Sequence, residues 1–181
     1  MALSKFDQKR LNYSKLSVAL IVFAYILYYL SDNSISSWHF IDAVNLIFHE
    51  AGHTIIFFLG KFVQIAAGSL FQILIPAVFA IYFFTHRQHF SGALVLFWLG
   101  QNFVNVSLYA RDAILMQMPL LGGDSVIHDW NYLLSNLGIL EHTDTVSSSI
   151  YFFGLVTIFA ALALSIFFSF ENKSDISKMY N

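Results

Sequence analysis

The chain contains no cysteine among its 181 residues and very little charge. Without cysteine there are no disulfides, no thiol nucleophile and no cysteine-ligated metal site, so any metal ion must be held by His, Asp or Glu. Charged residues make up 11% of the chain, whereas they make up about a quarter of an ordinary soluble domain. A net charge of −2 predicts no nucleic-acid partner. Together with a hydrophobic content of 57%, the low content of charged residues predicts an integral membrane protein.

Five apolar segments come close to the length of about 20 residues that a helix needs to cross a bilayer. We therefore predict an all-α fold, a polytopic membrane helical bundle of about five spans that forms a single domain over residues 1–181. Residues 1–12 form its N-terminal segment and residues 171–181 a polar, mobile tail. The predicted spans are Tyr13–Leu30, Phe40–Leu59, Ile65–Phe84, Phe90–Ala110 and Ser149–Phe170.

The bias of Lys and Arg predicts the orientation of these spans. The basic N-terminal stretch precedes an apolar run without a small-residue cleavage site, so we expect a retained first helix. With the N-terminus in the cytoplasm and five crossings, six of the nine basic residues fall inside. The prediction is a multi-pass protein of the plasma (inner) membrane, with residues 49–53 in the cytoplasmic half of the second span.

The region between the fourth and fifth spans has a different pattern. Ile114–Gly123 is apolar but short, and Pro119 with Gly122 and Gly123 disfavours a helix. We expect either a re-entrant loop that lines a hydrated pocket or an interfacial loop. A short amphipathic helix ending at Gly138 should follow, because apolar residues recur at helical spacing at Val126, Trp130, Leu133, Leu134 and Leu137.

The second apolar segment contains the motif HExxH at His49-Glu50-Ala51-Gly52-His53. Residues four apart lie on one face of a helix, so His49 and His53 can present two imidazoles to one metal ion. Glu50 can then act as the base for a water at that ion. Ionisable side chains within a membrane helix are costly, which favours a metal site over simple packing of these residues between helices.

The motif resembles that of the site-2 protease family of intramembrane zinc metallopeptidases, especially its short members. The later acidic segment adds to the resemblance, because Pro119 stands five positions before Asp124, as the family's proline stands before its aspartate ligand. Met116 and Ser125 occupy the positions where the family has asparagine and glycine. The resemblance implies zinc as cofactor, proteolysis within the membrane and Glu50 as catalytic base.

A catalytic zinc site needs a third protein ligand. The resemblance points to Asp124, whereas the residues themselves favour His128 or Asp129, because imidazole is a common zinc ligand and an adjacent carboxylate can orient it. Adjacent helical residues point about 100° apart, so His128 and Asp129 should not both bind the ion. We place His128 first, and Asp112 is a further candidate. The alternative is that Asp124 or Ser125 caps the helix and His128 and Asp129 form its wet face.

The fourth span carries a polar stripe that includes Gln101, Asn105 and Asp112 on one face. Such a stripe normally faces the interior of a bundle and forms interhelical hydrogen bonds. A functional alternative, suggested by the resemblance, is that Asn102 or Asn105 binds a substrate strand near the metal.

Three functions are compatible with these residues. The first is an intramembrane zinc metalloprotease that acts on a membrane protein, with a single-span substrate expected because helical peptide bonds must be unwound. The second is a metal-binding membrane scaffold without proteolysis, which would have no use for Glu50. The third is a serine hydrolase that uses Asp124, Ser125 and His128, although no nucleophile elbow surrounds Ser125. The sequence indicates neither the substrate's identity nor the oligomeric state.

Overall fold

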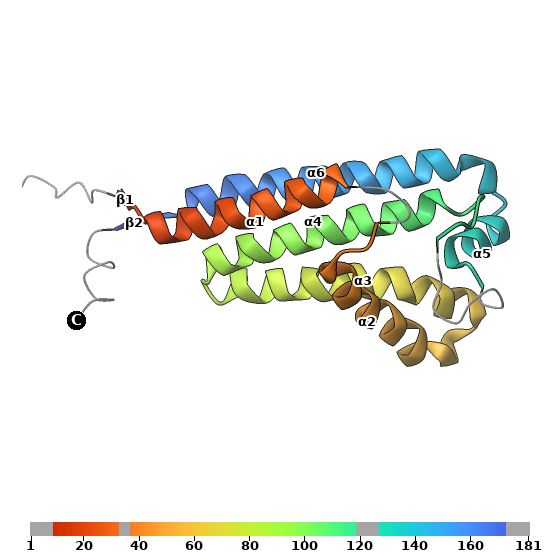
Figure 1. The fold of residues 1–181 in the computed structure, drawn as a ribbon. Helices are drawn as coiled ribbons and strands as arrows, with labels where there is room; N and C mark the ends of the chain where they lie inside the picture. The colour runs from red at the N-terminus through yellow and green to blue at the C-terminus, as the bar shows by residue number, and fades with distance from the viewer. Residues whose placement is uncertain (1–8, 33–36, 119–126, 173–181) are drawn as a thin grey trace, which may run out of the picture.

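A computed structural model describes residues 9–32, 37–118 and 127–172. Within these residues the chain is almost entirely helical (Figure 1). The α-helices are α1 (Tyr13–Ser31), α2 (Phe40–Ile55), α3 (Lys61–Thr85), α4 (His89–Arg111), α5 (Asp129–Asn136) and α6 (Thr143–Phe167). Two 3-10 turns, η1 (Phe57–Leu59) and η3 (Leu140–His142), and two short strands, β1 (Lys9–Leu11) and β2 (Phe170–Asn172), complete the described elements.

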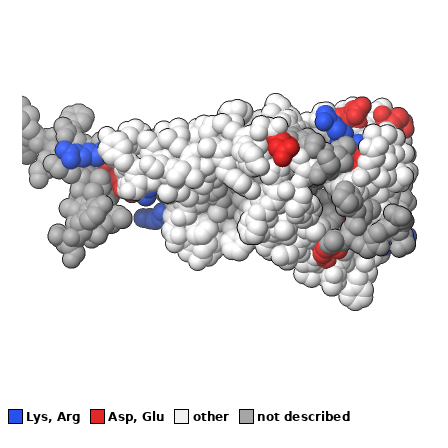
Figure 2. Space-filling model, viewed as in Figure 1, with Lys and Arg blue, Asp and Glu red and all other residues white. Residues whose placement is uncertain are grey.

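Four of the described helical segments are long and apolar enough to cross a membrane. They are α1, α3, α4 and the stretch Leu140–Phe167, which ends in α6. Large apolar side chains stand exposed along them, such as Ile21 at 69% and Phe159 at 59%, as is favourable for a surface in contact with lipid. In Figure 2 the basic side chains lie toward the two ends of the elongated bundle, and the surface between them is mostly uncharged, with isolated acidic groups. The predicted all-α polytopic membrane bundle is therefore confirmed.

Small residues hold the long helices together. A Cβ added to Gly100 of α4 would lie 2.6 Å from Ile158 Cγ1 of α6, and one added to Gly154 of α6 would lie 3.0 Å from the Gly100 carbonyl oxygen. Helices in lipid gain stability from such close backbone approach, because apolar burial alone does not distinguish a neighbouring helix from lipid tails. The contact between α4 and α6 forms the central seam of the bundle, with Phe97, Val104 and Ile158 fully buried.

Both described ends of the chain meet at one end of the bundle. Strands β1 and β2 pair antiparallel, and the Lys15 ammonium forms an ion pair with Glu171. The turn between α3 and α4 lies at the same end, because the Phe168 ring is 5.1 Å from the His89 ring. We call this the strand end, and the opposite end, which carries α5, the α5 end (Figure 1).

Helix α1 runs parallel to α4, from the strand end toward the α5 end. At its start, the Lys15 ammonium lies 5.3 Å from the centroid of the Phe90 ring, near the start of α4. Two turns before the end of α4, Asn105 Nδ2 donates a 3.3 Å hydrogen bond to the Tyr29 hydroxyl, near the end of α1.

Helix α2 continues in that same direction and does not cross back. Asp42, in its first turn, accepts a 3.0 Å hydrogen bond from Asn105, and farther along the His49 ring lies 5.8 Å from the ring of Tyr109. The predicted second span, Phe40–Leu59, is therefore a helix of 16 residues followed by a 3-10 turn. The apolar length of this segment predicts a full crossing, but length does not determine the direction in which a helix runs through the bundle.

The segment after α4 is a polar-anchored turn at the α5 end. The Asp112 carboxylate accepts hydrogen bonds from the backbone N–H groups of Gln117 (2.9 Å) and Met118 (2.7 Å). The predicted loop thus begins as irregular backbone, while its remainder, with Pro119, Asp124 and Ser125, lies outside the described residues. The predicted amphipathic helix is present as α5, and Gly138 follows it with a φ of 68°, a conformation that glycine adopts readily.

Candidate metal centre

Three potential metal ligands from two helices converge at the α5 end. His49 Nε2 lies 2.9 Å and His53 Nε2 lies 3.1 Å from Asp129 Oδ2. One ligand atom from each of the three residues lies within 4.8 Å of the others. Tetrahedral ligands at zinc distances are about 3.3 Å apart, so the two measured separations are close to those of a metal site. The i, i+4 spacing places both imidazoles on one face of α2, as the motif predicts.

The second nitrogen of each imidazole is held by a protein acceptor. His49 Nδ1 lies 3.3 Å from Gln72 Oε1, and His53 Nδ1 lies 2.9 Å from the Gln64 carbonyl oxygen, both on α3. We assign the ring proton to Nδ1 in each case, because the acceptors cannot donate. Both Nε2 lone pairs then face the Asp129 carboxylate. Such outer hydrogen bonds are typical of metal-binding histidines, since they fix the tautomer and the ring orientation.

A glycine of α3 forms the floor of this cluster. A Cβ added to Gly68 would lie 2.5 Å from His53 Nε2 and 2.6 Å from His49 Nε2. The helices approach closely here because Gly52 of α2 packs against the Ala67 carbonyl oxygen, 2.2 Å from where a Cβ would be. Both Nε2 atoms thus lie beside the space that a side chain of residue 68 would fill, and these residues fit a bound metal ion.

Three contacts fix Asp129 at the start of α5. Its backbone N–H donates a 3.1 Å hydrogen bond to the Tyr109 hydroxyl of α4. The next residue, Trp130, donates from its indole nitrogen to Ser69 Oγ of α3 at 3.1 Å, and Asn131 donates to the Ala113 carbonyl oxygen at 2.8 Å. Short helices contribute little stability of their own, so these bonds to α3, α4 and the turn after α4 are what hold the carboxylate against α2.

His128, the first candidate for the third ligand, turns away from the cluster. Its Nε2 lies 3.3 Å from Asp112 Oδ2, and its Nδ1 accepts a 3.3 Å hydrogen bond from the backbone N–H of Asn131. It caps α5, the role we had considered for Asp124 or Ser125. His128 and Asp129 diverge as adjacent residues must, and it is Asp129 that approaches the imidazoles. Asp112, the further candidate, is occupied by His128 and by the turn after α4.

Burial and neighbouring charges shift the pKa values of Asp129 and His128 in opposite directions. Burial raises the pKa of the Asp129 carboxyl, but where the His49 and His53 rings carry a proton on Nε2, their hydrogen bonds outweigh burial and hold that pKa below its ordinary value. Burial lowers the pKa of the His128 imidazole against the opposing effect of Asp112. An ionised carboxylate beside two imidazole nitrogens is an arrangement that favours a cation.

Glu50, the predicted base, lies next to His49 with its residue exposed. His49 and Asp129 are buried, with 8% of each side chain exposed, whereas 21% of the His53 side chain is exposed. The cluster is therefore covered on the His49 side and accessible beside His53. A catalytic site requires such an open position, while a structural metal site is closed.

A buried polar network extends from the cluster into the bundle. Gln72 Nε2 donates a 2.6 Å hydrogen bond to Asn105 Oδ1, and Asn105 Nδ2 donates to Asp42 Oδ1 at 3.0 Å. The same carboxylate oxygen accepts from the Tyr29 hydroxyl (3.2 Å) and from Gln101 Nε2 (3.3 Å). Polar groups buried among apolar helices must be satisfied internally, so this network ties α1, α2, α3 and α4 to the orientation of His49.

The two asparagines predicted as possible substrate contacts lie inside the bundle. Asn105 belongs to the network just described, and Asn102 is fully buried and donates a 2.8 Å hydrogen bond to the Trp98 carbonyl oxygen of its own helix. Neither faces the accessible side of the cluster. The polar stripe of α4 thus follows the expectation of interhelical hydrogen bonding for Gln101 and Asn105.

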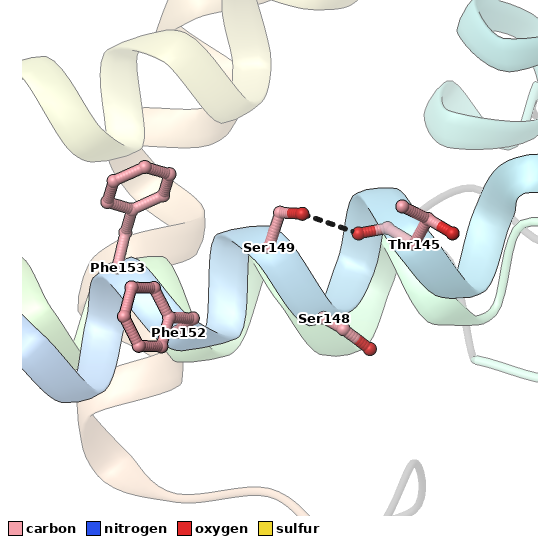
Figure 3. A pocket seen from close by; sticks show the side chains of 5 residues that line it. All are labelled: Thr145, Ser148, Ser149, Phe152 and Phe153. Carbon is pink, nitrogen blue, oxygen red and sulfur yellow. Dashed lines mark hydrogen bonds between the residues drawn. The ribbon is translucent and has the colours of Figure 1, made fainter.

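A separate groove lies on the outer side of α6 (Figure 3). Its residues are Thr145, Ser148, Ser149, Phe152 and Phe153. Ser149 Oγ donates a 2.7 Å hydrogen bond to the Thr145 carbonyl oxygen, so this hydroxyl is satisfied by its own helix. The groove shares no residue with the metal cluster and does not enlarge the candidate site.

Sequence analysis did not single out Gly68, Gln72, Tyr109 and Asp42, which shape the centre or orient its ligands. Gln72 and Asp42 are polar residues within apolar segments, and that was the available signal. Gly68 and Tyr109 carried none, because their roles depend on how α2, α3 and α5 meet. No protein-family model, curated protein or solved structure matches this chain in the comparisons.

Proposed function

We propose that this chain is an intramembrane zinc metalloprotease that hydrolyses a peptide bond in or near a membrane helix of another protein. The observation that supports this most is the convergence of His49, His53 and Asp129 at ligand spacing within an apolar helical bundle. Two histidines and a carboxylate are a donor set of catalytic zinc sites, which keep a fourth position open. Glu50, beside the first histidine, supplies the base that a structural site does not need.

Each residue has a distinct part in this reaction. Bound zinc would polarise the scissile carbonyl and acidify a water molecule. Glu50 takes the proton of the attacking water and later delivers it to the leaving amine. Gln72 and Gln64 keep the two imidazoles oriented through their Nδ1 atoms. Asp129 completes the ligand set from a different helix, so the site forms only when α5 is docked.

The substrate class follows from the setting of the site. Peptide bonds in a membrane helix are shielded by their own hydrogen bonds, so the substrate must unwind at the cleavage point. A single-span protein unwinds and approaches laterally through lipid more readily than a packed multi-span protein. We also propose a plasma (inner) membrane location with the N-terminus in the cytoplasm, on the basis of the Lys and Arg distribution.

The zinc content of purified protein tests the proposal. After zinc loading and dialysis, we expect stoichiometric zinc in the wild type and in a His142→Ala control, whose exposed imidazole lies outside the cluster. His49→Ala should lose both zinc and proteolysis of a reconstituted single-span substrate. Equal zinc in His49→Ala and wild type would refute the site. Stoichiometric zinc without cleavage of any single-span substrate would favour the scaffold function.

A further inference from the structure

We infer that the metal centre faces away from the cytoplasm, and that the bond it cleaves lies in the non-cytoplasmic half of a substrate helix. The statement about the substrate rests on the proposed function. The statement about the metal centre rests only on the direction of the helices and on the positions of the basic residues.

The metal ligands and the paired strands lie at opposite ends of the bundle. α1 leaves the strand end, and α2 continues in the same direction before α3 returns (Figure 1). His53 lies in the last turn of α2, and Asp129 begins α5, whose Tyr132 ring lies 5.2 Å from the Lys61 ammonium at the start of α3. The connection from α1 through α2 to α3 thus makes one crossing, and the cluster lies where it ends.

The basic residues are distributed unequally between these ends. At the α5 end there are two, Lys61 and Arg111. At the strand end the described chain has four, which are Lys9, Arg10, Lys15 and Arg87. Within the described residues, the strand end therefore has four basic residues against two at the α5 end.

This distribution assigns the strand end to the cytoplasm. Cytoplasmic loops and ends carry an excess of Lys and Arg close to the spans, while acidic residues contribute little to orientation. Five crossings had suggested six basic residues inside against three outside, with the motif on the cytoplasmic side. The pairing of β1 with β2 places both described ends on the cytoplasmic side. The metal site lies on the opposite side, because α2 does not cross back.

The natural absence of cysteine makes this directly measurable. Single cysteines can be placed at exposed positions of the full chain, Glu141→Cys at the α5 end and Gln88→Cys at the strand end. We expect a membrane-impermeant maleimide to label Glu141→Cys in spheroplasts as fully as after permeabilisation. Gln88→Cys should be labelled only after permeabilisation. The reverse pattern, or equal labelling of both in sealed spheroplasts, would overturn the inference.

Two further variants guard against local misfolding. Ser135→Cys and His86→Cys are also exposed, at the α5 end and the strand end respectively, and should repeat the pattern. The cleavage position is then mapped by mass spectrometry on a single-span substrate of fixed orientation. Cleavage in the cytoplasmic half would overturn the substrate statement. The labelling does not depend on activity, so a chain that shows the expected labelling but cleaves nothing contradicts the proposed function and leaves the orientation standing.

Discussion

Replacing Gly68 by alanine should strongly weaken metal binding while leaving the fold intact. The added methyl carbon would lie 2.5 Å from His53 Nε2 and 2.6 Å from His49 Nε2, well inside van der Waals contact. Moving the imidazoles away breaks their Nδ1 hydrogen bonds to Gln72 and Gln64. Loss of a single outer hydrogen bond of a metal site typically costs about 10–100-fold in metal affinity.

Because both imidazoles are displaced, we expect Gly68→Ala to weaken zinc binding by at least about 100-fold, or about 2.8 kcal/mol. The assay is competition with a zinc-buffering chelator in detergent, with helix content and thermal unfolding as checks of the fold. Gly92→Ala is the matched control, because the atoms nearest its added Cβ would be those of the Phe84 ring, at 3.1 Å, far from the metal cluster. Wild-type zinc affinity in a folded Gly68→Ala protein would refute the assignment of the cluster.

Three further outcomes follow from the contacts. Metal analysis should show that Asp129→Ala loses zinc while His128→Ala retains most of it. Hydrogen exchange should show that His128→Ala instead loosens α5. Equal zinc loss in the two variants would contradict the ligand assignment. Gln72→Ala should weaken zinc binding by about 10–100-fold without abolishing it, by the same chelator competition. The ion pair with Lys15 holds the pKa of Glu171 below its ordinary value of 4.5, so the stability it contributes is present at neutral pH and is lost as pH falls through that lowered pKa. Glu171→Gln should therefore lower the unfolding temperature at neutral pH, by an amount equivalent to no more than about 1 kcal/mol, and the difference should vanish in acid.

Local patterns in the sequence anticipated the parts of the molecule that depend on local geometry. The apolar segments begin and end within a few residues of α1, α3 and α4, because length and hydropathy decide those helices. The predicted last span, Ser149–Phe170, begins six residues later than α6 itself, at Thr143, because the polar first turn of that helix hides its start. The shared face of His49 and His53 is likewise a property of one helix.

The features that sequence analysis missed depend on contacts between helices. His128 and Asp129 are adjacent, and both residue types bind zinc. Only the packing of α5 against Asp112 and Tyr109 decides which of the two side chains approaches α2. The direction of α2 could not be predicted either, because an apolar segment has the same hydropathy pattern whether its helix crosses back or continues in the direction of the preceding helix. Asp42 gave a visible signal as a charge in an apolar stretch, but its partners lie on α1 and α4.

Zinc-dependent proteolysis with Glu50 as base is best tested with the variant Glu50→Gln. The variant and the wild type are loaded with zinc, reconstituted with the same single-span substrate, and assayed for cleavage. We predict unchanged zinc content and a loss of activity of at least about 10²–10⁴-fold, because the amide cannot accept the proton of the attacking water. Cleavage by Glu50→Gln at the wild-type rate would contradict the account, and activity that survives chelation but disappears in Ser125→Ala would establish the serine hydrolase instead.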